Sequence, residues 1–354
     1  MKAGVPALCD AAQPTVRLCR RCCMIRGSVS SHHPGTEFVL FISVVIPTYN
    51  RRPILRKCLD ALEHQQFRVG APIQGYEIVI VDDGSTDGTV DWLRDNPAYP
   101  HVRLYEQEHG GPARARNLGV EQALGETIIF IDSDLVVLPG FLQAHADALT
   151  AAYQRQGHDR CFTYGAVINT ANFDDPTSEL FKVTDYSNAF FATGNVAIAR
   201  HWLEQAGLFD VGFQLYGWED LELGVRLKKL GISLVRCPEA VGYHWHPAFS
   251  LDQIPKLIRQ EEERGRMGVL FYEKHPTWDV RMMIQMTWLH RLLWGLLSLG
   301  GTLNERTLAP LLRWLIRRGK PQLALEVARI FLNWYNVQAV YRAWRQHRRG
   351  EAIA

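Results

Sequence analysis

The feature that most constrains the fold is a short apolar stretch that ends in two acids. Residues 127–131, Thr-Ile-Ile-Phe-Ile, are all β-branched or aromatic, which is typical of a strand buried on both faces of a sheet. Asp132 and Asp134 follow directly. Carboxylates at the end of such a strand lie where open α/β sheets bind ligands, and hard oxygen ligands suit Mg²⁺ or Mn²⁺. Because an isolated Asp-x-Asp pair also occurs in ordinary turns, the interpretation depends on the rest of the chain.

Strand and helix patterns alternate between about residues 38 and 250. Strands are predicted at 38–46, 76–81, 102–105, 127–131, 161–168 and 232–235, and helices near 53–62, 89–94, 110–124, 139–153, just before 207 and at 217–230. Alternation at these lengths predicts βαβ units and a parallel sheet, hence an α/β domain over about 38–250. From about residue 251 the pattern is helical to the end, which predicts an α-helical C-terminal region over 251–354.

The N-terminal segment has a different composition. Residues 1–37 lack hydrophobic periodicity and predict a disordered tail, with Met24 as an alternative start. The tail holds four of the seven cysteines, Cys9, Cys19, Cys22 and Cys23. A zinc site would need a second pair of ligands, for which only His32 and His33 lie nearby, so zinc is disfavoured and a reducing compartment is expected.

The bulk composition excludes several classes of protein. A net charge of +2 argues against a nucleic-acid binder that works through bulk charge. No secretory signal is visible, and no apolar run approaches the ~20 residues that span a bilayer, so we expect a cytoplasmic protein without integral membrane segments.

Several ligand-binding motifs are also excluded. Asp83 could begin a calcium loop, but the twelfth position is Arg94, where a bidentate Glu is required. The first strand ends in Pro-Thr-Tyr-Asn at 47–50. The chain therefore has no G-x-G-x-x-G after that strand, and it has no P-loop motif either.

Four ordered motifs resemble those of family-2 glycosyltransferases. They are Val-Val-Ile-Pro-Thr-Tyr-Asn (44–50), Val-Asp-Asp-Gly-Ser-Thr-Asp (81–87), Gly-Pro-Ala-Arg-Ala-Arg-Asn-Leu-Gly (111–119) and Asp-Ser-Asp (132–134). The resemblance covers roughly residues 40–250. It implies a GT-A fold with a mixed, mostly parallel sheet, and a nucleotide-sugar donor, UDP-linked by expectation, held through Mn²⁺ or Mg²⁺.

The resemblance also implies roles for single residues. Donor-binding positions are Pro47, Tyr49, Asp83, Arg116, Asp132, Gly194 and Asn195, and the metal positions are Asp134 and His244. Tyr49 and Asp83 would contact the base, with Arg116 near it, and Asp132 would lie nearer the ribose. His244 belongs to a His-Trp-His segment that is equally compatible with a partly exposed histidine pair after a strand.

The second half resembles a galactosyltransferase-type C-terminal segment. The backbone of 193–195 would approach the donor sugar, and Gly-Trp-Glu-Asp (217–220) matches an acidic motif whose Asp is the catalytic base of inverting members. Because the chain lacks extra glycines here, both Glu219 and Asp220 remain candidates. As first-turn acids they should be held ionised by the helix dipole, although first-turn acids are also common without a catalytic role.

The C-terminal region carries an uneven charge. Between 306 and 349 there are ten Lys and Arg residues and one acid, Glu326, together with tryptophans and apolar residues at helical spacing. This combination is typical of helices that bind an anionic membrane surface. A helical subdomain that packs on the catalytic domain with a solvated basic face explains it equally well, and both alternatives stay open.

These patterns together predict an inverting hexosyltransferase of polysaccharide biosynthesis. It would move a sugar from a nucleoside diphosphate to a hydroxyl of a glycan, lipid or protein acceptor, in the cytoplasm or at the inner face of the membrane. Two alternatives remain: a sugar-phosphate nucleotidyltransferase, and a non-catalytic module that binds a nucleotide sugar or glycan.

Overall fold

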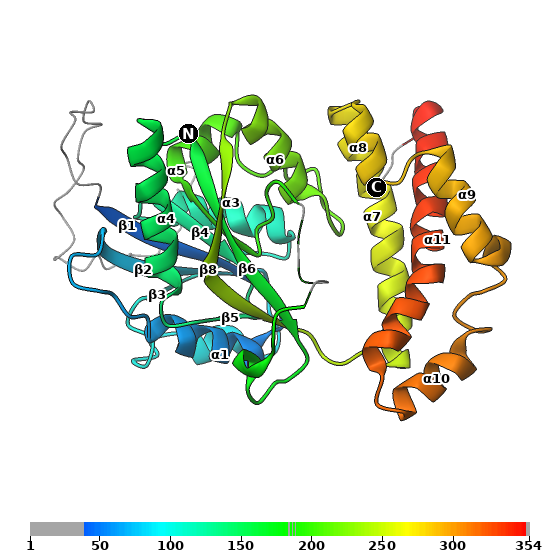
Figure 1. Cartoon of the computed structure of the whole chain (residues 1–354), viewed down its shortest axis with the longest axis horizontal. Helices are drawn as coiled ribbons and strands as arrows, with labels where there is room; N and C mark the ends of the chain where they lie inside the picture. The colour runs from blue at the N-terminus through cyan, green and yellow to red at the C-terminus, as the bar shows by residue number, and fades with distance from the viewer. Residues whose placement is uncertain (1–38, 183–184, 186, 188, 352–354) are drawn as a thin grey trace, which may run out of the picture. The chain divides into compact units, whose positions relative to one another are not determined.

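The computed structural model describes residues 39–182, 185, 187 and 189–351. The tail predicted at 1–37, with its cysteines and Met24, lies outside the described residues. The described chain begins with an α/β domain and continues into a set of helices (Figure 1). Among the described helices, none has the length and apolar character of a membrane-spanning segment.

The α/β domain is built on one eight-stranded sheet. Its strands are β1 (Leu40–Thr48), β2 (Ile73–Asp82), β3 (Val102–Glu106), β4 (Thr127–Ile131), β5 (Leu135–Val137), β6 (Cys161–Thr170), β7 (Asn195–Ala199) and β8 (Ser233–Trp245). Their spatial order is β3-β2-β1-β4-β7-β6-β8-β5, with β7 antiparallel to both neighbours and β5 antiparallel to β8. The mixed, mostly parallel sheet predicted from the sequence is confirmed.

The largest differences between the predicted and the observed strands concern β2, β5 and β8. β2 begins at Ile73, whereas the predicted strand began at residue 76. β5 was not predicted, because three apolar residues after an acid pair carry no strand signal of their own. β8 continues to Trp245 instead of ending at residue 235, because its far half pairs with β5 and β6.

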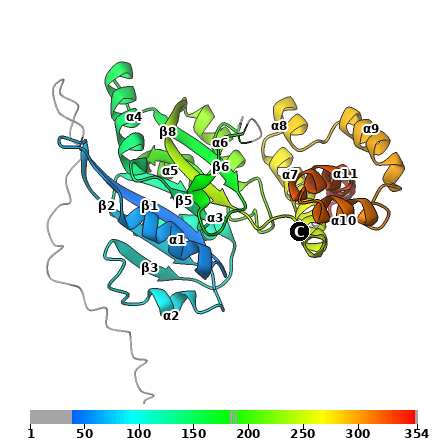
Figure 2. The ribbon, with the colours of Figure 1, turned by 60° about the horizontal axis from the view of Figure 1, so that its bottom comes forward.

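Helices cover both faces of the sheet (Figure 2). They are α1 (Arg52–Glu63), α2 (Thr89–Leu93), α3 (Pro112–Gln122), α4 (Phe141–Gln156), α5 (Arg200–Ala206) and α6 (Glu219–Lys229). Alternate side chains of β1 divide between two apolar cores, since Val44 belongs to the core that α1 and α4 cover, and Val45 to the core that α3, α5 and α6 cover. All five residues of β4 are buried, as the sequence predicts.

The C-terminal helices pack on one another. They are α7 (Ile254–Lys274), α8 (Trp278–Met283), α9 (Trp288–Leu297), α10 (Ala309–Arg317) and α11 (Pro321–Arg348). The apolar positions of α10 and α11, such as Leu312, Leu315 and Phe331, are buried in one cluster with Phe249. The predicted helical region is thus observed, and these positions of α10 and α11 serve packing, whereas other apolar positions of both helices are exposed.

Helix α7 also contacts the α/β domain. The indole Nε1 of Trp218 donates to the carbonyl of Arg264 at 2.7 Å. His275 contacts the carboxylate of Glu222 in α6 at 2.8 Å. These contacts attach the C-terminal helices to the start and the middle of α6.

Gly119 allows α3 to lie close to β1. A Cβ at this position would overlap Cγ1 of Val45, a fully buried strand residue. Gly119→Ala should therefore lower the free energy of unfolding by about 1–3 kcal/mol, the usual cost of overpacking, although Ala normally stabilises a helix relative to Gly. Chemical denaturation would measure the change. Gly140→Ala is the matched control, because nothing lies within 4 Å of its Cβ position; equal effects of the two substitutions would contradict the close packing.

Candidate active site

The two acids after β4 lie in a tight turn that leads into β5. The backbone N–H of Leu135 donates to the carbonyl of Asp132 at 3.0 Å, which closes the turn. β5 then pairs antiparallel with β8, so that Leu135 stands opposite His244. The N–H of Trp245 donates to the carbonyl of Asp134 at 2.9 Å. This register brings His244 beside Asp134, two residues that are far apart in the sequence.

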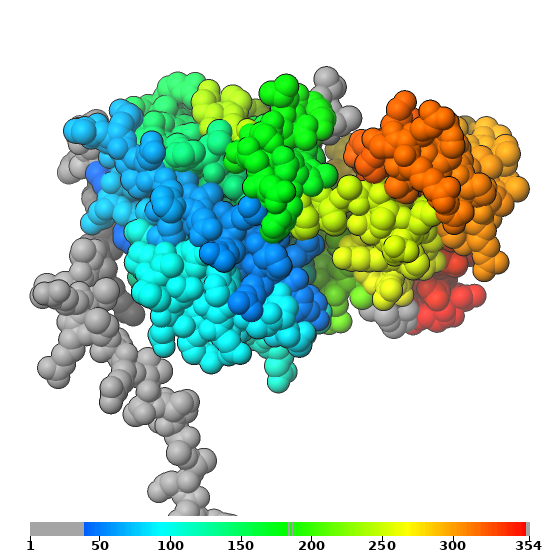
Figure 3. Space-filling model, turned by 90° about the horizontal axis from the view of Figure 1, so that it is seen from below, coloured from blue at the N-terminus to red at the C-terminus, as the bar shows by residue number. Residues whose placement is uncertain are grey.

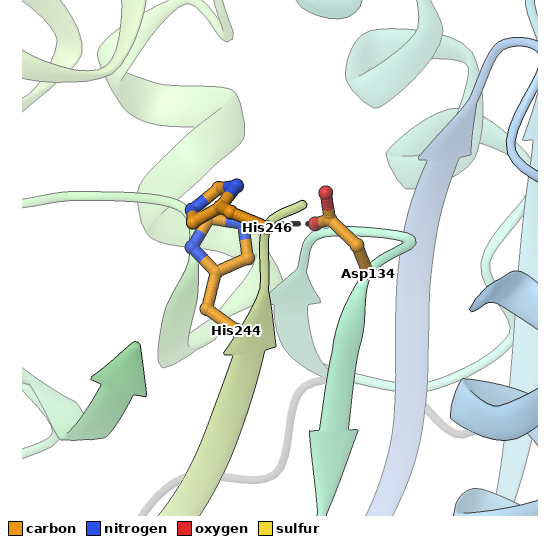
Figure 4. A group of neighbouring side chains, drawn as sticks. All are labelled: Asp134, His244 and His246. Carbon is orange, nitrogen blue, oxygen red and sulfur yellow. Dashed lines mark ion pairs between the residues drawn. The ribbon is translucent and has the colours of Figure 1, made fainter. Parts of the chain in front are cut away.

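Asp134 lies in a cluster of side chains of metal-ligating types (Figure 4). Its Oδ1 lies 2.8 Å from Nε2 of His244, and its Oδ2 lies 3.4 Å from a guanidinium nitrogen of Arg51. The rings of His244 and His246 are in contact, with centroids 4.0 Å apart. One ligand atom from each of Asp134, His244 and His246 lies within 4.8 Å of the others. The histidine pair left open by the sequence is thus part of a cluster with the acid.

The donor set of this cluster fits a divalent cation. One carboxylate and two imidazoles suit a transition metal such as Mn²⁺ better than Mg²⁺, which prefers oxygen ligands. Burial opposes protonation of His244, but the carboxylate of Asp134 outweighs it and raises the pKa of this histidine. Burial and the charge of His244 lower the pKa of His246 to about 4. His246 is therefore neutral at physiological pH and offers a lone pair.

A buried arginine joins three sequence motifs in one network. Arg116, on α3, is 5% exposed. Its guanidinium donates to Asp132 Oδ1 at 3.2 Å and to Glu219 Oε1 at 3.0 Å. Burial disfavours its charge, but the carboxylates of Asp132 and Glu219 outweigh that and raise the pKa of Arg116. The arginine motif, the Asp-x-Asp pair and the Trp-Glu-Asp segment are consequently parts of a single site.

The two neighbouring acids of α6 have different environments. Glu219 is buried against Arg116, whereas Asp220 has no ion-pair partner among the described residues and accepts a hydrogen bond from the N–H of Leu221 at 2.7 Å. Burial, and after it the charge of Glu219, raises the pKa of Asp220 to about 7. Desolvation opposes the expected effect of the helix dipole on Asp220 and exceeds it, because a first-turn position contributes only about 1 kcal/mol.

An unusual turn presents these acids. Gly217 and Trp218 both have positive φ, 93° and 80°, and this conformation is rare for a bulky residue. The bond from the Trp218 indole to Arg264 in α7 holds the strained residue in place. This segment has fewer glycines than some relatives of the motif that it resembles, and the contact with α7 fixes its backbone conformation instead.

Two adjacent residues predicted to bind the donor differ in position. Gly194, just before β7, borders the candidate site, whereas Asn195, the first residue of β7, lies behind it. A Cβ at Gly194 would lie 3.4 Å from Oδ2 of Asp132, so the Gly194 backbone borders the acid pair. Asn195 is fully buried, and its side chain bonds to Nε2 of His145 at 2.8 Å and to the carbonyls of Ala166 and Ala240. Asn195 therefore fixes the sheet, and only the backbone of this segment is available to a ligand.

The ends of β1 and β2 form a second part of the site. Pro47 lies inside β1, opposite Val81 of β2. Just after the strand, the half-exposed ring of Tyr49 stacks on His109, with centroids 4.4 Å apart. His109 was not identified from the sequence, where its only signal is its place directly before two glycines.

Asp83 organises the loop that carries His109. Its carboxylate accepts hydrogen bonds from the backbone N–H groups of Gly110 and Gly111, at 2.8 and 2.9 Å, and from the side chain of Gln107 at 2.6 Å. The side chain of Arg51, which reaches Asp134, follows Tyr49 by two residues. The aromatic pair and the metal-binding cluster are thus connected through one short segment.

Comparisons with known proteins identify similar sequences. Residues 43–206 match the family model described as glycosyl transferase family 2. Chondroitin synthase of Escherichia coli is 27% identical over 243 residues, which is 58% of this chain and 35% of that protein. Glycosyltransferase AglE of Haloferax volcanii is 29% identical over 59% of this chain and 68% of its own length. Validoxylamine A glucosyltransferase of Streptomyces hygroscopicus is 30% identical, over 59% and 56% respectively. The chain thus spans only part of these relatives.

A solved structure shares the fold. A mannosyltransferase from Pyrobaculum calidifontis, solved with GDP-Man and Mn²⁺, matches 85% of this chain and 88% of its own with a TM-score of 0.53. The sequence identity is 18%, so the likeness concerns the architecture, and it supports the GT-A type of sheet predicted above.

The raised pKa of Asp220 has a consequence for stability. Because the folded state binds this proton up to about pH 7 while the unfolded chain releases it near pH 4, stability should fall as pH rises through that window. Asp220→Asn removes the effect, so the variant should exceed wild type by about 1–3 kcal/mol at pH 7.5 and match it near pH 4. Denaturant titrations at several pH values measure this, with Asp91→Asn at an exposed acid as control. A pH-independent difference would contradict the shift.

Proposed function

The chain belongs to glycosyl transferase family 2 through residues 43–206, and from this premise we propose that it transfers a sugar from a nucleoside diphosphate to an acceptor hydroxyl with inversion. The donor-binding domain would cover residues 38–250, and residues 251–354 would form a helical region attached to it. The bonds of Arg116 to Asp132 and Glu219 are the observation that carries this proposal, because they unite a donor-side acid and an acceptor-side acid in one site.

The nucleotide would bind at the ends of β1 and β2. The exposed ring of Tyr49, stacked on His109, offers an aromatic surface for the base. Asp83 would act here mainly by holding the loop at 107–111, whose backbone N–H groups it binds. Asp132 would lie near the ribose, and Gly194 would let the backbone approach the donor sugar. A UDP-sugar is the donor that we propose to test first.

The diphosphate would lie near Asp134, His244 and His246. These three side chains would hold Mn²⁺, in line with the metal in the mannosyltransferase structure. A bound divalent metal supplies positive charge to the departing diphosphate. Arg51, within 3.4 Å of Asp134, adds a second cation that the sequence had not indicated.

Asp220 is our choice for the base that accepts the proton of the acceptor hydroxyl. A general base works best when its pKa lies near the working pH, and the pKa of Asp220 is raised to about 7. Glu219 is held by Arg116 and would serve to orient the arginine and the start of α6. This difference in environment supports Asp220 over Glu219 as the base, a choice that the sequence left open.

The acceptor is proposed as a hydroxyl of a glycan or of a lipid-linked glycan, in polysaccharide biosynthesis at the cytoplasmic side. The family match favours sugar transfer over the nucleotidyltransferase alternative. A module that only binds a nucleotide sugar would show donor binding without turnover, which an assay separates directly.

Donor binding should depend on a metal held by Asp134. UDP-, GDP- and dTDP-sugars would be screened with and without Mn²⁺ for protection against thermal unfolding and for release of nucleoside diphosphate. A bound donor at a hundredfold its Kd should add about 2.7 kcal/mol of stability. Asp134→Asn should lose the Mn²⁺-dependent part, whereas Asp147→Asn, at an exposed acid paired with Arg68, should keep it. Protection of the Asp134 variant by Mn²⁺ to the same degree as wild type would refute the metal assignment.

Asp220→Asn should lower kcat by roughly 10²–10⁴ and leave donor affinity nearly unchanged, because a general base acts in the chemical step. The wild-type kcat/KM should rise with pH up to about pH 7 and then level off, since the carboxylate must be ionised to accept a proton. Glu219→Gln is the comparison variant. If it proves more damaging to kcat than Asp220→Asn, the two roles are exchanged; if both variants stay active, the inverting mechanism is wrong.

A further inference from the structure

Helix α9 presents an apolar face to solvent. Its sequence from Trp288 to Leu297 contains no buried residue. Six large apolar side chains are exposed, Trp288, Leu289, Leu292, Leu293, Leu296 and Leu297, with Trp288 at 72% and Leu296 at 65%. Their spacing repeats every four residues in adjacent pairs, so they share one face of the helix. A helix surface that contacts only water normally carries polar side chains, so an apolar face of this width indicates a further contact.

The opposite side of α9 explains why the helix holds this orientation. Gly295 lies against α11, where an added Cβ would come within 3.4 Å of the Trp334 ring. Ser298, directly after the helix, is buried and caps the next turn by accepting from the N–H of Gly301 at 3.1 Å. The helix is thus anchored through its small residues, which leaves the leucines outward. No described segment lies outside α9 in the views of Figures 1–3.

The residue that follows α9 extends this apolar surface. Leu299 is 63% exposed. Together with the six residues of α9 it forms what we call the α9 face. Contiguous exposed apolar patches of this kind mark interaction sites for proteins or membranes.

Positive charge borders the α9 face. A groove of about 310 Å³ between α9 and α11 is lined by Arg291, Arg342 and Arg345 together with Trp334 and Tyr341. No acid lines this groove, although Arg342 also pairs with Glu262 at 2.9 Å. The guanidinium of Arg291 lies over the ring of Tyr341 at 5.2 Å. Because Arg291 belongs to α9 itself, the groove is continuous with the edge of the apolar face.

Helix α10 also combines exposed apolar side chains with arginines. On α10, Leu311 and Trp314 are exposed beside the exposed Arg313 and Arg317, and the guanidinium of Arg318 lies 5.4 Å from the Trp314 ring. Arginines next to an interfacial tryptophan are typical of surfaces that contact lipid headgroups.

We propose that the α9 face docks on the surface of an anionic phospholipid bilayer, with headgroup phosphates in the arginine groove. The ten residues of α9 extend only about 15 Å, against about 30 Å for a hydrocarbon core, so the helix lies along the surface. A second copy of the chain is a less suitable occupant, because each copy would bring the same cationic edge to the contact, whereas anionic headgroups neutralise it.

The experiment is sedimentation of the full chain with vesicles of phosphatidylcholine alone or mixed with phosphatidylserine. Binding should favour the anionic vesicles and weaken as salt rises, because salt screens the arginines. The double variant Leu292→Glu with Leu296→Glu should lower the partition coefficient at least about tenfold, from the lost burial of two leucines. Val69→Glu is the matched control, because Val69 is fully exposed in a loop of the α/β domain.

A second pair of substitutions tests the charge separately. Arg291→Glu with Arg345→Glu should lower binding to anionic vesicles at least about tenfold, since each basic residue at such a surface contributes about fivefold, while Arg155→Glu on α4 should have no effect. These variants keep the test valid if the leucine variant does not fold, which circular dichroism would show.

Three results would overturn the proposal. They are equal binding to neutral and anionic vesicles, unchanged binding of both double variants, and a dimer in light scattering that the leucine variant disrupts without any loss of lipid binding.

Discussion

The active-site region depends on the burial of one guanidinium. An arginine removed from water requires carboxylates within hydrogen-bonding distance, because an unpaired buried charge costs several kcal/mol. Arg116 meets this requirement with Asp132 and Glu219, which come from the end of β4 and the start of α6. Helix α3, β4 and α6 are therefore constrained to meet at one point. The Nε of Arg116 has no partner in the described structure, so the network stabilises a geometry more than it maximises hydrogen bonding.

Around this network, environment separates residues that look alike in the sequence. Glu219 and Asp220 are adjacent acids, yet one is bound to an arginine and the other is desolvated beside a like charge. Their chemical roles can therefore differ. Gly194 and Asn195 are also adjacent, yet one borders Asp132 while the side chain of the other is used inside the sheet. For the two acids the direction of the side chain decides, and this follows from the turn of the helix. For the second pair the difference is that Gly194 offers only its backbone, whereas the Asn195 side chain points into the sheet.

The C-terminal helices contribute to the candidate site from outside the sequence motifs. Helix α7 binds the indole of Trp218 and so stabilises the strained turn before Glu219. Strain of this kind persists only where surrounding structure fixes it. The same set of helices buries part of the apolar residues of α10 and α11 in one cluster and leaves those of α9 exposed. Packing thus accounts for the buried residues, and the proposed membrane contact rests on the exposed residues of α9 and α10.

The sequence by itself determined the strand-and-helix alternation and the acids at strand ends, because periodicity and turn residues are local signals. Ordered motifs also indicated the family, and the mixed sheet was expected only through that resemblance. Tertiary structure alone decided which residues meet. The pairing of β5 with β8 brings His244 to Asp134, and the β1–α1 loop brings Arg51 there. The pKa of Asp220 likewise depends on burial and a neighbouring charge. Distances between remote side chains, and the desolvation that follows from them, are set by packing and leave no local trace in the sequence.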